Sequence, residues 1–211
     1  ILSAPGAPPA ADVDRRALLR QGSALAWAAL AGAGPVAALA SPHAQAEVER
    51  ALREGGVVIA LRHALAPGTF DPPEFRLGDC STQRNLNDEG RAQARRIGQW
   101  FSSRGLKPTR VRSSPWCRCV DTATLAFGGA EVWPALGSPR GTEAAVSAQA
   151  LPQLRQALQS VRTQRGRFEA WVTHMFVLSD LTGEGSSSGE GLVLRADANG
   201  AVKVLARLAI S

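Results

Sequence analysis

A short apolar run at residues 57–60 constrains the fold most strongly, because it predicts a buried strand that ends in Arg62 and His63. In open α/β sheets, ligands bind at the carboxyl ends of the strands. The Arg-His pair is therefore predicted at a ligand site. The alternative for His63 is a buried histidine whose ring only fills the core.

Two further strand-like runs end in residues of the same kind. The run at 110–113 is followed by Arg118, and the run at 168–173 is followed by His174. Guanidinium forks match phosphate oxygens, and imidazoles donate to them or attack phosphorus. Two arginines and two histidines, each at a strand end, can converge on one phosphate, which indicates that the chain binds a phosphate group.

Strand patterns alternate with helix patterns along most of the chain, which predicts an α/β fold with a mainly parallel sheet. Asn87 is the expected N-cap of one helix, and Gly105 is expected to close it. Pro115 is expected to begin the next helix. Further helices are predicted at 47–53 and 148–162, and a helix or turn at 175–181. A short strand is predicted near 131–133, and a terminal hairpin of strands at 192–195 and 202–208.

The N-terminal part has the composition of an export signal. A twin-arginine pattern at 14–20 is followed by a weakly apolar stretch at 22–40 and by small residues that end at Ala46. We expect a twin-arginine-type signal with a disordered N-terminus over 1–46, cleavage after Ala46, and one domain over 47–211. The domain would then be periplasmic or otherwise exported.

A membrane anchor is the alternative for the apolar stretch at 22–40. That stretch is rich in alanine and glycine and contains Pro35, whereas a membrane span needs roughly 20 strongly apolar residues. No other segment is apolar enough to span a bilayer, so no stable membrane insertion is expected after cleavage.

The charge of the chain is +6, and removal of the predicted leader lowers it only to +5. Nearly all cations are arginine, the side chain that holds oxyanions through two parallel hydrogen bonds. A positive net charge is also typical of proteins that bind nucleic acid. Because the arginines are scattered and no basic run is interleaved with aromatic residues, the expected partner is a small phosphorylated molecule and not nucleic acid.

Three cysteines leave two disulfide pairings open. In an oxidising compartment Cys80 can pair with Cys117 or with Cys119, whereas Cys117 and Cys119 are too close in sequence to pair with each other. A zinc site made of the cysteines and histidines is the alternative. The Cys-x-Cys spacing is not that of a zinc knuckle, so no metal is expected.

Four motifs, in order, make the chain resemble the histidine phosphatase superfamily, the phosphoglycerate mutase-like proteins. The family's motifs are Arg-His-Gly, Leu-x-x-x-Gly-x-x-Gln-Ala, Ser-x-x-x-Arg followed by Thr-Ala, and a strand that ends in His. They match residues 62–64, 86–94, 114–118 with 122–123, and 172–174. Together they cover nearly the whole predicted domain.

This resemblance implies a three-layer α/β/α sandwich and a histidine acid phosphatase-like phosphomonoesterase that needs no metal or cofactor. It implies that His63 is the nucleophile that becomes phosphorylated, and that Arg62, Arg118 and His174 form the phosphate site. Arg84 is a further candidate phosphate ligand from the long loop that ends near Asn87, although a solvated loop arginine is equally expected.

The chain departs from the family pattern at three places. Ala64 replaces the usual glycine, and Met175 and Phe176 are bulkier than the residues common after the final histidine. The family's general acid has no clear match. The candidate acids are Glu143, preferred, and then Glu131, Asp79 and Glu190.

The missing acid leaves two hypotheses open, an enzyme and a phosphate- or phosphosugar-binding protein that turns over weakly. A third hypothesis is a structural protein of the cell envelope with a vestigial pocket. The segment at 80–86 also resembles exported bacterial proteins related to lipopolysaccharide core heptose phosphatases. The sequence does not predict the substrate or the oligomeric state.

Overall fold

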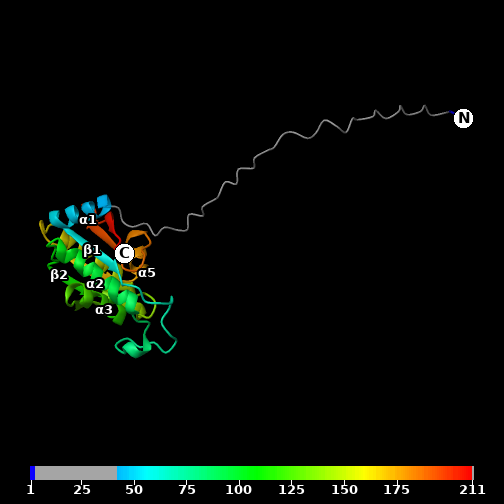
Figure 1. Cartoon of the computed structure of the whole chain (residues 1–211), viewed down its shortest axis with the longest axis horizontal. Helices are drawn as coiled ribbons and strands as arrows, with labels where there is room; N and C mark the ends of the chain where they lie inside the picture. Colours follow the sequence, from blue (N-terminus) through cyan, green and yellow to red (C-terminus); the bar gives the residue numbers. More distant parts are fainter. Residues whose placement is uncertain (3–41, 211) are drawn as a thin grey trace, which may run out of the picture. The chain divides into compact units, whose positions relative to one another are not determined.

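The computed structural model describes residues 1–2 and 42–210 (Figure 1). The twin-arginine pattern and the apolar stretch at 22–40 lie outside the described residues. No helix in the described part is long and apolar enough to cross a membrane. In chain order the elements are α1 (Pro42–Glu54), β1 (Val57–Arg62), η1 (Cys80–Thr82), α2 (Asp88–Ser103), β2 (Arg110–Ser113), α3 (Cys117–Phe127), β3 (Glu131–Val132), η2 (Pro134–Leu136), α4 (Ala144–Arg162), β4 (Phe168–Thr173), α5 (Met175–Thr182), β5 (Gly191–Ala196) and β6 (Val202–Leu208).

The strands form one sheet in the order β3-β2-β4-β1-β5-β6. Strands β1 to β4 run parallel, whereas β5 and β6 form the predicted antiparallel hairpin at one edge. Strand β4 lies between β1 and β2, with Thr173 opposite Arg62 and Val172 opposite Ser113. The carboxyl ends of these three strands therefore lie side by side.

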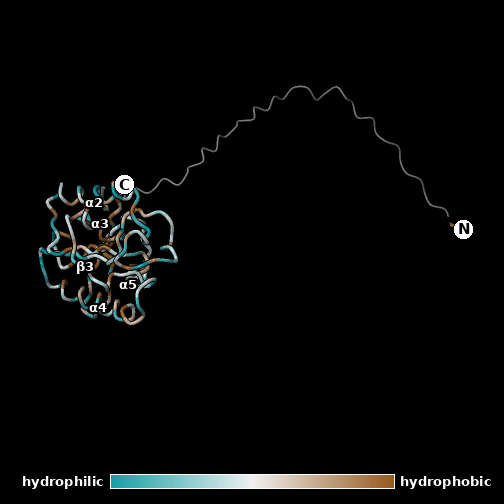
Figure 2. Tube along the Cα trace, turned by 90° about the horizontal axis from the view of Figure 1, so that it is seen from below, coloured by the Kyte–Doolittle hydropathy of each residue, from teal (hydrophilic) through white to brown (hydrophobic). Residues whose placement is uncertain are grey.

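The core has two halves, one on each face of the sheet, because successive side chains of a strand point to opposite faces. In β1, Val57, Ile59 and Leu61 pack into the half that contains α1, α2 and α3. Val58 and Ala60 pack into the half that contains α4 and α5. Figure 2 shows the apolar strands between these two helical layers. The predicted three-layer α/β/α sandwich is confirmed.

Helix α2 begins as predicted, because the Asn87 side chain accepts a hydrogen bond of 2.8 Å from Gly90 N. Gly90 also lies so close to the main chain of Leu65 that a Cβ would overlap the Leu65 carbonyl. Glycine at this position lets the start of α2 pack directly on the chain that follows His63.

Helix α1 is longer than predicted, because it begins at Pro42 instead of residue 47. In its first turns, the Gln45 side chain accepts a hydrogen bond of 3.0 Å from Trp100 Nε1 in α2. Cleavage after Ala46 would remove this contact and leave the buried Val48 in place.

Helix α3 begins two residues later than predicted, at Cys117 instead of Pro115. Trp116 is extended at the N-cap, and its N–H donates to the Ser114 hydroxyl, 3.3 Å away. This turn holds Pro115 outside the helix. The last large helix, α4, begins at Ala144, four residues earlier than predicted.

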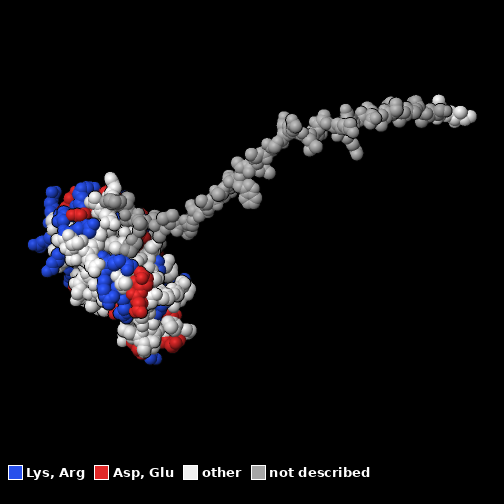
Figure 3. All heavy atoms as spheres, in the orientation of Figure 1, with Lys and Arg blue, Asp and Glu red and all other residues white. Residues whose placement is uncertain are grey.

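The basic residues are spread over the surface. On the face shown in Figure 3, the blue side chains form several groups, with red acidic side chains beside some of them. Arg50 pairs with Glu54, and Arg53 pairs with Glu49, at exposed positions of α1. These pairs are those of a solvated surface. That nucleic acid is not a partner stays a prediction from the sequence.

Candidate active site

The predicted strand-end residues meet because the parallel ladder continues one residue beyond the strands. The N–H of His63 donates to the carbonyl of Thr173 at 2.9 Å, and the N–H of Ser114 donates to the carbonyl of Val172 at 2.9 Å. His174 comes next on the central strand, so its ring lies between the ends of β1 and β2. The ring centroids of His63 and His174 are 5.5 Å apart.

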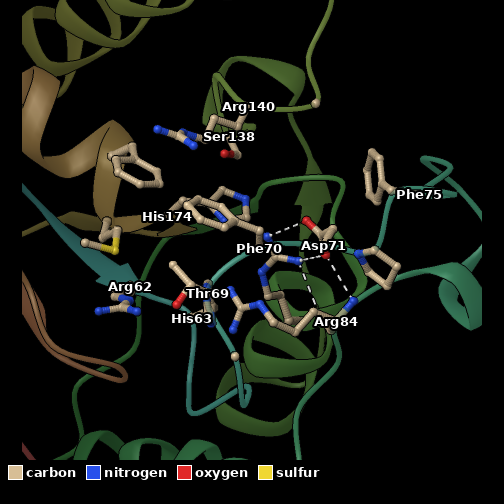
Figure 4. Close-up of a pocket in the computed structure, with 16 residues that line it drawn as sticks. Arg62, His63, Thr69, Phe70, Asp71, Phe75, Arg84, Ser138, Arg140 and His174 are labelled. Carbon is tan, nitrogen blue, oxygen red and sulfur yellow. Dashed lines mark hydrogen bonds and ion pairs between the residues drawn. The ribbon is translucent and has the colours of Figure 1, made fainter.

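A cavity of about 610 Å³ opens over these strand ends (Figure 4). We name its charged inner part the cavity floor; it consists of Arg62, His63, Arg84, Arg118 and His174. We name three outer side chains from separate segments the cavity rim; they are Phe70, Arg140 and Phe176. In Figure 4, Arg62, His63 and Arg84 lie below His174, whereas Arg140 lies above it.

His63 is held in the state that a nucleophile requires. Its Nδ1 lies 2.7 Å from the carbonyl oxygen of Ala64, which can only accept, so Nδ1 carries the proton and Nε2 keeps its lone pair. Burial lowers the pKa of His63 to about 3; the bond to Ala64 opposes this shift, and the charges of Arg118, Arg84 and Arg62 add to it. The imidazole is therefore neutral near pH 7.

His174 is buried and neutral as well. Its Nε2 is 2.8 Å from the Ser114 hydroxyl, and its Nδ1 is 3.5 Å from Nη2 of Arg118. Since the guanidinium can only donate, Nδ1 accepts there and Nε2 carries the proton. Burial, followed by the charge of Arg118, holds the pKa of His174 well below its ordinary value.

Three floor arginines keep an unused donor. The Nε atoms of Arg62, Arg84 and Arg118 are buried and have no hydrogen-bond partner among the described residues. Arg62 donates from Nη1 to the carbonyl of Ser186 at 2.9 Å, and Arg84 donates from Nη1 to the carbonyl of Ala66. A buried donor without a partner costs free energy, which an oxyanion in the cavity would relieve.

Asp71 fixes the orientation of Arg118 through two hydrogen bonds. Its two carboxylate oxygens accept from Nη1 and Nη2 of Arg118 at 2.8 and 3.2 Å, and also from Arg84 N and Trp116 Nε1. Burial raises the pKa of Asp71, but the hydrogen bonds from Arg118 and the Arg84 main chain outweigh this and leave it below its ordinary value.

The cavity carries an excess of positive charge. Four arginines line it, and Asp71 is the one acidic side chain among the described residues that line it. Burial lowers the pKa of Arg62 and Arg84, and the neighbouring charge of Arg118 lowers both further. Because arginine stays protonated in proteins, this crowding of cations favours an anion with more than one negative charge.

A model of the histidine phosphatase superfamily (branch 1) matches residues 59–140, the stretch that contains Arg62, His63 and Arg118. Over these residues the chain is similar to the histidine phosphatase superfamily. A search of curated proteins finds no match.

Solved structures with the same fold accompany this family match. The protein histidine phosphatase SixA complexed with tungstate is 18% identical, with a TM-score of 0.51 over 72% of this chain and 96% of that chain. A phosphoserine phosphatase mutant from Entamoeba histolytica in complex with phosphoserine is 13% identical, with a TM-score of 0.52 over 72% and 95%. The alpha-ribazole phosphatase from Shigella flexneri is 14% identical, with a TM-score of 0.51 over 74% and 98%.

The acids named from the sequence do not line the cavity. Glu143, the preferred candidate, is exposed at the N-cap of α4. Glu131, Asp79 and Glu190 each form an ion pair with an arginine outside the floor. The carboxylate that reaches the cavity is Asp71, and its oxygens already accept four hydrogen bonds.

The cysteine pairing that the sequence left open is Cys80 with Cys117. Cys119 is free and buried, and burial raises its pKa to about 12, so its thiol is not a nucleophile. The disulfide ties the long loop to the residue before Arg118. Within the described residues, no group of three histidine, cysteine or acidic side chains could hold a metal ion.

Gln93, in the motif of α2 that resembles the family, holds two segments that adjoin the floor. Gln93 accepts from the N–H of Leu65 at 3.0 Å and donates to the carbonyl of Ser188 at 2.9 Å. It thus connects the chain after His63 to the loop that holds Arg62. Gln83 has a similar part in the segment at 80–86, because its side chain accepts from Cys117 N at 3.0 Å.

Sequence reasoning missed Asp71 and most of the outer cavity. The length of the loop between β1 and α2 signalled a functional segment. No pattern, however, distinguishes Asp71 from the acids that were named. Ala64, where the family has glycine, is buried and does not line the cavity, whereas Met175 and Phe176 do line it.

Proposed function

We propose that this histidine phosphatase is an exported phosphomonoester phosphatase that forms a phosphohistidine on His63. The observation that carries the proposal is the neutral His63 ring, with its Nε2 lone pair free, beside three arginines whose buried Nε atoms have no hydrogen-bond partner among the described residues. Oxyanion sites and activated nucleophiles depend on such arrangements.

The reaction follows from this geometry in two steps. Nε2 of His63 attacks phosphorus, an N–P bond forms, and the ester P–O bond breaks with its electron pair on the leaving oxygen. Water then attacks the phosphohistidine, the N–P bond breaks, and inorganic phosphate leaves. His63 is restored, and the net reaction consumes one water.

The rest of the floor stabilises the transferring group. Arg62, Arg84 and Arg118 neutralise the charge on the phosphoryl oxygens, which would otherwise repel the imidazole. The Nη2 of Arg118 also lies against His174 Nδ1, so His174 and Asp71 together orient the guanidinium. Each of these groups is fixed before substrate arrives, so little reorganisation is needed.

Loss of the nucleophile tests the proposal. We expect the purified full chain to release inorganic phosphate from members of a phosphomonoester panel, and His63→Ala to lower kcat by about 10,000-fold or more. The control is His43→Ala, whose side chain is 84% exposed on α1. A quenched reaction should contain an acid-labile phosphoryl group on the wild type and on His43→Ala, but not on His63→Ala. Wild-type turnover by a folded His63→Ala protein would refute the mechanism.

A binding protein of the same fold is the second candidate. The bond of Asp71 to Arg118 favours it, because a carboxylate already occupies both Nη atoms. Binding of inorganic phosphate by calorimetry, with no phosphate released from any ester in the panel, would select this alternative.

Export is the remaining part of the proposal. The twin-arginine pattern and the small residues before Glu47 support it, as does a disulfide that suits an oxidising compartment. Expressed in a bacterium, the full chain should appear in the periplasm with Glu47 as its first residue. Replacement of Arg15 and Arg16 by lysine should retain it in the cytoplasm. Periplasmic delivery of that double variant would contradict the proposal.

A further inference from the structure

The outer part of the cavity is apolar and poorly covered. Phe70 is 58% exposed and Met175 is 37% exposed, although both side chains line the cavity. Phe75 and Phe176 line it as well. Apolar side chains around a charged floor bind the part of a ligand that carries no phosphate.

The rim forms a site for a flat group. The guanidinium carbon of Arg140 lies 4.8 Å from the ring centroid of Phe70 and 5.2 Å from that of Phe176, so one cation bridges two rings. No carboxylate pairs with Arg140 among the described residues. Guanidinium and aromatic planes both stack on aromatic rings.

A sugar would find few partners here. Outside the floor and Asp71, the polar side chains that line the cavity are Thr69, Ser138 and Arg140. Each sugar hydroxyl that is buried without a hydrogen bond lowers affinity. The lining therefore favours a leaving group with few hydroxyls.

The floor also lacks a free acid for the leaving oxygen. The oxygens of Asp71 accept from Arg118, Trp116 and the Arg84 main chain, so this carboxylate is committed to positioning. A leaving oxygen that departs without a proton must itself be a weak base. Phenols, with a pKa of about 10, are far stronger acids than aliphatic alcohols.

We infer that the substrates are phosphate monoesters of phenols, with the aryl ring seated among Phe70, Arg140 and Phe176. This inference rests on the proposed function. Nε2 of His63 forms the N–P bond while the aryl P–O bond breaks, and the electron pair leaves as an aryl oxide that takes a proton from water. Hydrolysis of the phosphohistidine by water completes the reaction, so one ester and one water give one phenol and one phosphate.

The first experiment compares leaving groups with the full-length protein. Substituted phenyl phosphates whose phenols differ in acidity are assayed beside glycerol phosphate and glucose 6-phosphate. We expect kcat to rise steeply with the acidity of the phenol, because no protein acid assists. We expect kcat/KM for phenyl phosphate to exceed that for glucose 6-phosphate by about 100-fold or more. A shallow dependence on acidity, or a preference for the sugar phosphate, would overturn the inference.

The second experiment tests the rim. Arg140→Ala and Phe176→Ala should each lower the ratio of kcat/KM for phenyl phosphate to that for glycerol phosphate by about tenfold, the size of a lost stacking contact. Arg155→Ala, at an exposed position of α4, is the matched control. An unchanged ratio in both folded rim variants would show that the ring binds elsewhere.

A third experiment asks whether the aryl ring belongs to a small molecule or to a tyrosine residue. It compares kcat/KM for phenyl phosphate with kcat/KM for a short phosphotyrosyl peptide. If kcat/KM for either aryl ester exceeds that for glucose 6-phosphate, the inference is supported. The aryl ester with the higher kcat/KM then identifies the source of the ring. Failure of the proposed function looks different: no ester is hydrolysed, or His63→Ala keeps its activity. Turnover that depends on His63 but favours sugars refutes this inference alone.

Discussion

The floor and the rim of the cavity are built in opposite ways. His63 and His174 are 2% and 3% exposed and follow directly from paired strands, so the register of the sheet fixes their positions. Phe70 and Arg140 come from loops, and Phe70 is more than half exposed. In the proposed function, the register of the sheet therefore positions the two imidazoles of the phosphoryl chemistry, whereas loops carry two of the three rim side chains that select the ester.

The largest effect that separates the two regions is expected at Arg118. Arg118→Lys should lower kcat/KM about 100-fold on every ester, since lysine cannot reproduce the two parallel hydrogen bonds to an oxyanion or to Asp71. A rim variant should instead change the ratio between esters. Steady-state kinetics on phenyl and glycerol phosphates measures both effects.

The control for this prediction is Arg110→Lys, at an exposed arginine that pairs with Glu131. Its activity should stay within about twofold of wild type, because exposed ion pairs contribute little. If Arg118→Lys lowered kcat/KM for only one class of ester, a floor residue would also determine substrate preference. The predicted difference between floor and rim would then be wrong.

A smaller effect is expected where α2 supports the floor. Gly90→Ala places a methyl group against the Leu65 carbonyl, and should lower the free energy of unfolding by about 2 kcal/mol, as overpacking does. Gly185→Ala is the control, because a Cβ there meets nothing within 4 Å. Urea unfolding measures both. Equal stability of the two variants would show that α2 can shift away from the floor without cost.

The sequence predicts the floor well because its signals are local. The strands predicted at residues 110–113 and 168–173 have the observed bounds, and the strand predicted from the apolar run at residues 57–60 extends two residues further, to Arg62. The Asn87 cap depends on a contact only three residues along the chain. Parallel pairing then brings the strand ends together without further information.

The rest of the site depends on distant contacts, which no local pattern encodes. Asp71 meets Arg118, 47 residues away, and the rim joins Phe70 to Arg140 across 70 residues. The same limit affects the prediction of the acid, because Glu143 lies at the exposed start of α4 and does not line the cavity. Loop folding decided which carboxylate reached the cavity.

The smallest expected effect concerns acid stability, which tests whether the floor imidazoles are truly held neutral. Unfolded histidine titrates near pH 6.5, whereas the pKa of His63 is about 3 and that of His174 is well below its ordinary value. Between these values the unfolded chain binds protons that the folded chain does not. The free energy of unfolding should therefore fall as the pH is lowered from 7 to 5, by on the order of 1 kcal/mol per imidazole.

Removal of one imidazole should weaken this pH dependence. His174→Asn is expected to lose less stability between pH 7 and pH 5 than wild type, whatever its stability at pH 7, because one proton-binding group of the unfolded chain is gone. Urea unfolding in buffers without phosphate gives the comparison, with His43→Asn as the control. If wild type and His174→Asn lose the same amount, His174 takes up its proton in the folded state. The His174 imidazole would then be accessible to protons from solvent, as the exposed rim side chains are. The floor and the rim would in that case differ only in whether strands or loops position their residues.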